Sequence, residues 1–281
     1  MTDAENAELR GLLQVRDNFE EQYDPEVFSE EHAEFKNTHN GVFLRLIRYC
    51  EDRREEPPAA DADAATTRVF FLDGPDGGTA SALVHKGNLK PSQCYVANRH
   101  ESTCDALRRS GGGILPEENV VHATSSEALS KRPAPDIADL TIKEEQQQRG
   151  AFAHLEFTGY YFDGCGGYVP HVVNMMSSAL LVVDTDGVSG NDDNNTANLR
   201  KRHLNPIVVG YSLLGGKKNV VEKELEISRA LTIIARSMGM RMVHALDDPS
   251  RFGLPPSVSK LGGNSENTFT TWLVLEPDDY R

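Results

Sequence analysis

Four short turns in the sequence combine polar side chains with small residues, a composition suited to ligand binding. The first runs from Asp73 to Thr79 and contains Gly74, Gly77 and Gly78. Glycines let a ligand approach the backbone closely, and the start of a following helix offers N–H groups to an anionic group. The sequence therefore predicts a binding turn here, with an ordinary strand-to-helix turn as the alternative.

Two further turns carry amide and hydroxyl groups that could contact the same ligand. Asn98 ends an apolar stretch, and its amide can accept one hydrogen bond and donate another. Thr124 and Ser125 follow the next apolar stretch and offer two hydroxyls. Helix capping competes with ligand binding at both turns, and at the second we favour a cap by Ser125 or Ser126 ahead of Glu127.

The fourth turn is the most distinctive stretch of the chain and contains Asp163, Cys165, Gly166 and Tyr168. A carboxylate at this position could orient a substrate or remove a proton from it. The glycine would let a substrate approach the backbone, and Tyr168 would shape its pocket. Cys165 is more typical of a small, half-buried side chain than of a nucleophile, because nothing in the sequence indicates a lowered thiol pKa.

Short apolar stretches alternate with helical patterns along most of the chain, which indicates an open parallel sheet with helices on both faces. Strands are expected at 69–72, 94–97, 120–123, 160–162, 207–211, 240–246 and 268–275. Helices are expected at 79–86, 102–109, 137–154, 171–181 and 220–238. In the last helix, Val221 and Leu225 are predicted to face the core. No helical pattern separates the last two strands, so they are expected to pair antiparallel.

The N-terminal part of the chain has a different character from the rest. Residues 2–52 show helical spacing, and the Pro-rich, acidic tract 55–63 that follows is typical of a linker. We therefore predict a helical extension with its linker at 1–60 and an α/β domain at 61–281. The polar stretch 184–198 has too few apolar residues to pack and is predicted to be a mobile surface loop.

The order of these elements and turns resembles the class I S-adenosylmethionine (SAM)-dependent methyltransferases over roughly residues 68–277. The resemblance implies a Rossmann-like, seven-stranded, mostly parallel sheet with a C-terminal antiparallel hairpin. In this chain an N-terminal helical extension would precede the sheet. It also implies SAM as the cofactor and methyl transfer as the reaction.

The resemblance assigns the cofactor to the first three turns. The amino-acid end of SAM would lie on Asp73, Gly74, Gly77 and Gly78, although the glycines are more closely spaced than the family pattern. Asn98 would meet the ribose, where the family has a carboxylate. The adenine would lie near Thr124 and Ser125.

The resemblance places the methyl acceptor beside the fourth turn and beside the end of the fifth strand, which is expected at 207–211. Asp163 would be the catalytic residue that orients or deprotonates the acceptor. The acceptor would contact Cys165, Gly166, Tyr168 and, in the loop after the fifth strand, Tyr211.

Three other classes of protein compete with this interpretation. A catalytically silent methyltransferase-like protein that acts through partner binding is favoured by the compressed glycine spacing and by Asn98. An α/β-hydrolase with Cys165 as nucleophile conflicts with Asp163, because the nucleophile elbow needs glycine at that position. A nicotinamide-dependent oxidoreductase lacks its spaced glycine motif.

The composition of the 281 residues bounds the partners and the compartment. A net charge of −14 disfavours a nucleic-acid acceptor, although nucleic acid, protein and small molecule all stay open. The absence of a CxxC pair, of an apolar N-terminal segment and of a membrane-length apolar run predicts a cytoplasmic protein. No spacing of ligands predicts a metal, and His32, His39 and His85 receive no role. The N-terminal helices could cover the active site or form an oligomer contact.

Overall fold

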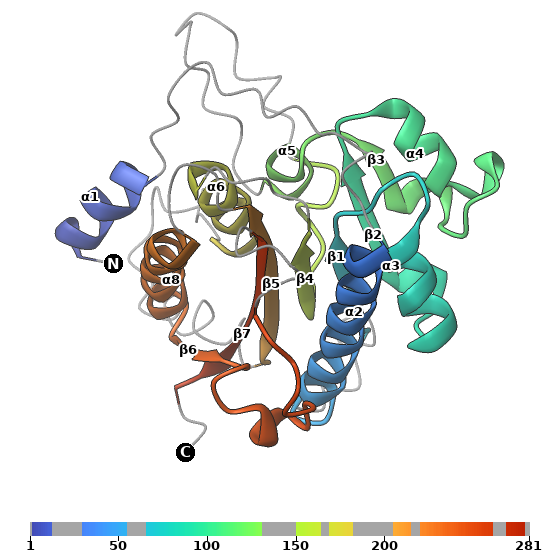
Figure 1. Ribbon diagram of the computed structural model, residues 1–281. Helices are drawn as coiled ribbons and strands as arrows, with labels where there is room; N and C mark the ends of the chain where they lie inside the picture. Colours follow the sequence, from blue (N-terminus) through green and yellow to red (C-terminus); the bar gives the residue numbers. More distant parts are fainter. Residues whose placement is uncertain are drawn as a thin grey trace, which may run out of the picture.

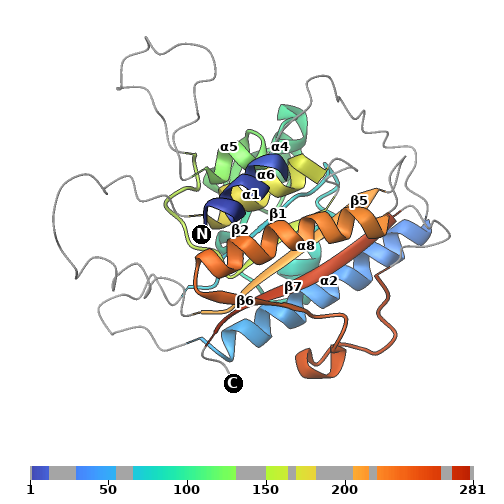
Figure 2. The ribbon, with the colours of Figure 1, turned by 90° about the vertical axis from the view of Figure 1, so that its left-hand side faces the viewer.

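A seven-stranded sheet with helices on both faces forms the centre of the molecule (Figure 1). The computed structural model describes residues 2–12, 30–54, 66–130, 150–163, 169–181, 205–214, 220–260 and 268–278. Viewed from the side, the helices α1, α6 and α8 lie over one face, and α2 lies over the other (Figure 2). A separate apolar core fills the space on each face of the sheet.

The sheet has the strand order β3-β2-β1-β4-β5-β7-β6. Its strands are β1 (Val69–Phe71), β2 (Cys94–Asn98), β3 (Val120–His122), β4 (Gly159–Phe162), β5 (Ile207–Leu214), β6 (Met240–His244) and β7 (Thr268–Pro277). The first five strands pair parallel, whereas β7 runs antiparallel between β5 and β6. The predicted fold class and C-terminal hairpin are thus confirmed. Val69, Phe70 and Phe71 of β1 are fully buried, as expected for a strand covered on both faces.

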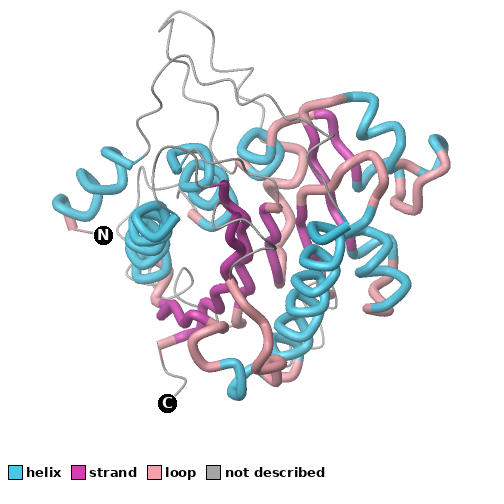
Figure 3. The backbone as a smooth tube through the Cα atoms, viewed as in Figure 1, coloured by secondary structure: helices cyan, strands magenta, loops and turns pink. Residues whose placement is uncertain are grey.

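Helices alternate with strands as predicted, but the described helix between β3 and β4 is Ser125–Leu129, which precedes the expected range 137–154 (Figure 3). They are α1 (Asp3–Leu12), α2 (Glu30–Glu51), α3 (Gly78–Ser81), α4 (Glu101–Leu107), α5 (Ser125–Leu129), α6 (Val169–Leu180) and α8 (Val220–Ser237). The π-helix η2 (Ala82–Lys86) continues α3. Residues 151–154 form turns instead of the end of the helix predicted at 137–154. The rest of that helix, the linker tract 55–63 and the loop 184–198 lie outside the described residues. Among the described helices, none has the length and apolar character needed to cross a membrane.

The buried face of α8 differs from the prediction. Val221 and Leu225 are 57% and 61% exposed, so the expectation that they face the core is wrong. The buried stripe instead contains Ile227, Leu231 and Ile234, at helical spacings of four and three. At about 100° per residue, Val221 and Leu225 lie roughly 110° and 150° around the helix from the centre of that stripe, which turns them toward solvent.

Two glycines in the sheet allow α2 to pack closely on its face. A Cβ atom at Gly159 of β4 would come within 2.7 Å of the Phe43 ring of α2. A Cβ atom at Gly210 of β5 would come within 2.2 Å of the Trp272 ring of β7. The rings of Phe43 and Trp272 stack with their centroids 5.2 Å apart. The helix α2 therefore shares an apolar core with the sheet.

Two sets of polar contacts fix the position of α2 along the sheet. Near the middle of the helix, the indole N–H of Trp272 donates a hydrogen bond to Nδ1 of His39 at 2.8 Å. Near its end, the Tyr49 hydroxyl donates to the buried carboxylate of Glu276 in β7 at 2.6 Å. Arg241 and Arg251 neutralise Glu276 at 2.9 Å and 2.5 Å. These contacts place the first turns of α2 at the edge of the sheet where the parallel strands end.

Candidate functional site

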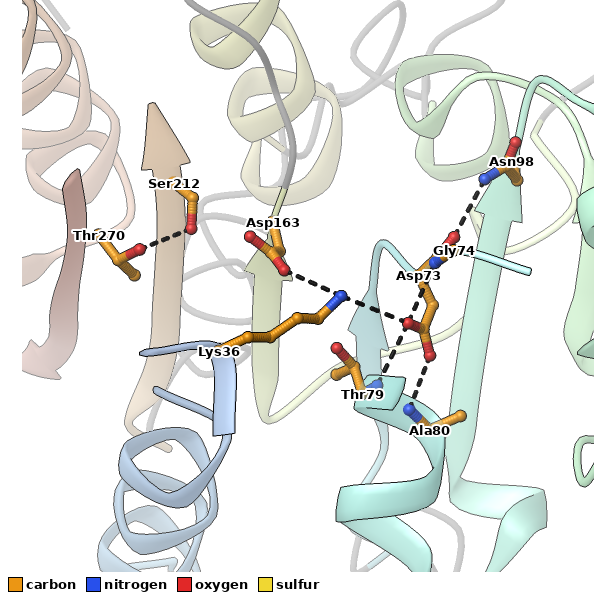
Figure 4. Close-up of polar contacts among 9 residues, drawn as sticks. All are labelled: Lys36, Asp73, Gly74, Thr79, Ala80, Asn98, Asp163, Ser212 and Thr270. Carbon is orange, nitrogen blue, oxygen red and sulfur yellow. Dashed lines mark hydrogen bonds and ion pairs between the residues drawn. The ribbon is translucent and has the colours of Figure 1, made fainter. Parts of the chain in front are cut away.

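The register of the sheet brings three of the predicted turn residues into one row. Phe71 at the end of β1 pairs with Val96 of β2 and with Tyr161 of β4. The residues two positions further along these strands are Asp73, Asn98 and Asp163. All three side chains lie at the carboxyl-terminal edge of the sheet (Figure 4), which is where ligands bind in open α/β folds.

Asp73 binds the start of the helix that follows it. Its Oδ1 accepts hydrogen bonds from the N–H groups of Gly74 at 3.1 Å and Thr79 at 3.2 Å, and its Oδ2 accepts from Ala80 at 2.7 Å. Burial raises the pKa of the Asp73 carboxyl, while Lys36 and the two helical N–H groups oppose that rise. The expectation that this helix offers free N–H groups to a ligand is therefore wrong for Thr79 and Ala80.

The glycine turn after Asp73 is compact. Gly77 has a φ of +60°, a left-handed conformation that favours glycine, and its N–H donates to the Gly74 carbonyl at 3.0 Å. The Asp76 carboxylate folds back over the turn, since a Cβ atom at Gly74 would lie 2.9 Å from Asp76 Oδ1 and one at Gly78 would lie 3.4 Å from Oδ2. The glycines thus expose their backbone beside an acidic group.

Asn98 links the ends of two neighbouring strands. Its Nδ2 donates to the Asp73 carbonyl at 3.1 Å, and its Oδ1 accepts from the His100 N–H at 2.8 Å. The N-cap of α4 is His100, so the capping interpretation of Asn98 is wrong. Because a carbonyl oxygen has two lone pairs, Oδ1 retains the capacity to accept one further hydrogen bond.

Thr124 and Ser125 both belong to the start of α5. Thr124 is the N-cap and forms a capping box with Glu127: its Oγ1 accepts from the Glu127 N–H at 3.2 Å, and its own N–H donates to Glu127 Oε2 at 2.8 Å. Ser125 is the first residue of the helix and is buried. Capping at this turn is confirmed, with Thr124 as the cap instead of the predicted Ser125 or Ser126.

Sequence reasoning missed Lys36, which α2 brings into the row of turn residues. Its Nζ lies 3.2 Å from Asp163 Oδ2 and 3.7 Å from Asp73 Oδ1, between the two carboxylates (Figure 4). Burial lowers the pKa of Lys36, but the charges of Asp163, Asp73 and Asp76 outweigh burial and raise it overall. Lys36 is therefore an ammonium ion at neutral pH.

A signal for Lys36 is present in the sequence. It precedes the apolar residues Phe43 and Ile47 by seven and eleven positions, a spacing that places all three on one face of a helix. Phe43 and Ile47 are buried against the sheet. This spacing predicts only a buried face, and the predicted division into an extension at 1–60 and an α/β domain at 61–281 gives that face no part in the site.

His39, one turn after Lys36, is a second overlooked residue. Its side chain is fully buried, and its Nδ1 accepts the Trp272 N–H. Burial lowers the pKa of His39 to about 4, with partial opposition from Asp163 and the Ser259 backbone. The imidazole is therefore neutral near pH 7 and carries its proton on Nε2, because Nδ1 acts as the acceptor.

The remaining predicted residues fall outside or beneath this row. Cys165, Gly166 and Tyr168 lie outside the described residues. Tyr211 lies within β5, which continues to Leu214, and its fully buried ring packs edge-on against Phe269. Burial raises the pKa of the Tyr211 hydroxyl. The structure thus places Tyr211 in the core instead of in a loop that contacts an acceptor.

A buried hydroxyl pair extends the row beyond Asp163. Phe162 pairs with Tyr211, so the next residue of β5 in the same register beside Asp163 is Ser212. The Ser212 hydroxyl lies 2.7 Å from that of Thr270 in β7 (Figure 4). The edge of the sheet from β2 to β7 is consequently polar, with two carboxylates and one ammonium at its centre.

The sheet order, with β7 antiparallel between β5 and β6, is typical of class I SAM-dependent methyltransferases. No protein-family model and no curated protein sequence matches the chain. Among solved structures, a geranyl diphosphate methyltransferase in complex with GPP and sinefungin is similar, with a TM-score of 0.34 and 7% sequence identity. The match covers 82% of this chain and 77% of that one. The fold assignment therefore rests on the strand order itself.

Proposed function

We propose that this protein is a SAM-dependent methyltransferase. The observation that carries the proposal is the row formed by Asp73, Asn98 and Asp163 at the carboxyl-terminal edge of a sheet with methyltransferase topology. Three turns that are far apart in the chain converge there, and the resemblance to methyltransferases implies a cofactor or acceptor role for each.

The side chains in this row offer SAM acidic groups and an open glycine backbone at its amino-acid end, and an amide at its ribose end. SAM is cationic. Two acids, Asp73 and Asp163, surround the single positive charge of Lys36, so the site has a net negative charge that attracts a cation. The Gly74–Gly78 backbone can be approached closely. At the ribose end, Asn98 Oδ1 would accept one hydroxyl hydrogen bond, which is weaker than a bond to a carboxylate.

Asp163 has the position required of the residue that acts on the acceptor. SAM supplies the electrophilic methyl group, so the protein must hold the acceptor in line and accept its proton where one is released. The Asp163 carboxylate is partly exposed, and Lys36 holds its Oδ2 in place. Asp163 would orient the acceptor and take that proton.

Binding of SAM is the first test. Isothermal titration calorimetry of the folded protein with SAM and with S-adenosylhomocysteine should show saturable binding to one site. Asp163→Asn should keep that binding but lower methyl transfer by roughly 100-fold or more, as expected for loss of a general base. If the folded protein shows no binding to either compound, the proposal is wrong.

A catalytically silent methyltransferase-like protein is the second candidate. It is favoured because polar groups of the site already form hydrogen bonds within the protein: Asp73 accepts from the start of α3, and Asn98 bonds to both Asp73 and His100. Calorimetry separates the two candidates: a folded protein that gives no heat with SAM supports the silent protein, which would act through its partners.

The charge of the chain bears on the acceptor and the compartment. A net charge of −14 favours a small-molecule or protein acceptor over a nucleic acid. We propose a cytoplasmic location on the basis of the cysteine content: Cys50, Cys94 and Cys104 are free and buried.

A further inference from the structure

We propose that Lys36 binds the carboxylate at the amino-acid end of SAM, and that α2 is consequently part of the cofactor site. This inference rests on the proposed function, and it assigns a task to a residue from a segment that lies outside the resemblance to methyltransferases. Its starting point is the contact that Lys36 makes with both Asp73 and Asp163.

The first argument is that the expected partner of the carboxylate is already occupied. A carboxylate at this turn would ordinarily be bound by N–H groups at the start of α3. Asp73 takes the N–H groups of Thr79 and Ala80, at 3.2 Å and 2.7 Å. An anionic group that approaches the turn also meets the Asp76 carboxylate over Gly74. The cofactor carboxylate therefore needs a cation close to this turn.

The second argument is that Lys36 has donor capacity left. An ammonium group has three N–H donors. Among the described residues, Lys36 makes one contact of hydrogen-bond length, 3.2 Å to Asp163, while its 3.7 Å separation from Asp73 is an ion pair without a hydrogen bond. The Lys36 side chain is 32% exposed, so a ligand can reach it.

The third argument is the pattern of charge. The amino-acid end of SAM is a zwitterion, with one ammonium and one carboxylate on the same carbon. Lys36 and Asp76 present the complementary charges: the exposed Asp76 carboxylate lies over Gly74, close enough for its charge to help raise the pKa of Lys36. Lys36 would bind the carboxylate of the ligand and Asp76 would face its ammonium, which leaves Asp163 to the acceptor.

The fourth argument is that Lys36 is held in place before any ligand binds. His39, one turn along α2, accepts the Trp272 N–H, and Phe43, two turns along, packs over Gly159. The helix that carries Lys36 is thereby fixed to β4 and β7, so little conformational freedom remains to be lost on binding.

The test compares two ligands with Lys36→Met. S-adenosylhomocysteine carries the amino-acid end, whereas 5′-methylthioadenosine lacks it and keeps the nucleoside. We expect the variant to bind S-adenosylhomocysteine roughly 10- to 100-fold more weakly, the effect of losing one hydrogen bond to a charged group. Its affinity for methylthioadenosine should be unchanged, and Lys36→Arg should restore part of the lost affinity.

Lys260→Met is the matched control, because Lys260 also bridges two acids, Glu224 at 3.3 Å and Asp247 at 3.1 Å. It should leave the affinity for both ligands unchanged, and circular dichroism should show that both variants fold.

Three results are decisive against the inference. An equal loss for both ligands means that Lys36 only supports the structure. Tighter binding of S-adenosylhomocysteine by Lys36→Met means that Lys36 is an internal competitor of the cofactor. If neither ligand binds the unaltered protein or the variant, the methyltransferase proposal itself fails, which the first two results would not imply.

Discussion

The buried histidine of α2 makes the stability of the protein depend on pH. His39 is fully buried, its Nδ1 accepts the Trp272 N–H, and its pKa is lowered from 6.5 to about 4. Protonation would put a hydrogen on Nδ1, which would break that hydrogen bond and leave a charge among apolar rings. Asp163 and the Ser259 backbone oppose this effect, and they reduce the pKa shift without reversing it.

The sign and size of the effect follow from this shift. Because the pKa is lower in the folded state, the unfolded chain binds the proton more readily between 6.5 and about 4. His39 thus contributes stability above pH 6.5 that is lost as the pH falls toward 4. One pKa unit corresponds to about 1.4 kcal/mol, so the loss by about pH 4.5 amounts to roughly 2 to 3 kcal/mol.

The assay is urea denaturation of the unaltered protein and of His39→Gln at about pH 7 and about pH 4.5. The glutamine can still accept the Trp272 N–H, but it does not titrate. Other groups contribute equally to both proteins, so the stability lost on acidification should be roughly 2 to 3 kcal/mol smaller in the variant. The same replacement at the exposed His85 should not change that loss. Equal losses in His39→Gln and the unaltered protein would refute the reasoning.

Two further predictions concern packing and capping. Gly210→Ala should destabilise the fold by roughly 1 to 3 kcal/mol in urea denaturation, because its Cβ would lie 2.2 Å from the Trp272 ring. Gly41→Ala is its control: nothing lies within 4 Å of that Cβ on α2, so the helix should gain roughly 0.5 to 1 kcal/mol. Thr124→Ala should cost about 1 kcal/mol through loss of the α5 capping box, measured in the same way. If the loss in the free energy of SAM binding in Thr124→Ala exceeds the loss in the free energy of unfolding, Thr124 also contacts the adenine.

Much of the fold could be predicted because each strand has a sequence pattern that can be recognised without knowledge of the rest of the chain. Unbroken apolar runs such as Val69–Phe71 mark strands buried on both faces, and their alternation with helices leaves few topologies. The side-chain roles were harder to predict. Thr124 and Asn98 each have several local bonding options, and only the position of the next helix decides which residue is the cap. The prediction that Val221 and Leu225 face the core is wrong because the apolar character of two residues does not fix the rotation of a helix about its axis.

The sequence by itself determined the order of the strands along the chain and the polar residue that ends each of β1, β2 and β4. The tertiary structure alone decided which of those ends meet, since register depends on pairing between segments that are distant in the chain. It also decided that α2 packs on β4 and β7 through Gly159 and Trp272, which brings Lys36 between Asp73 and Asp163. A charge pair between residues so far apart in sequence leaves no local pattern, because it forms only where the packing of the backbone brings the side chains together.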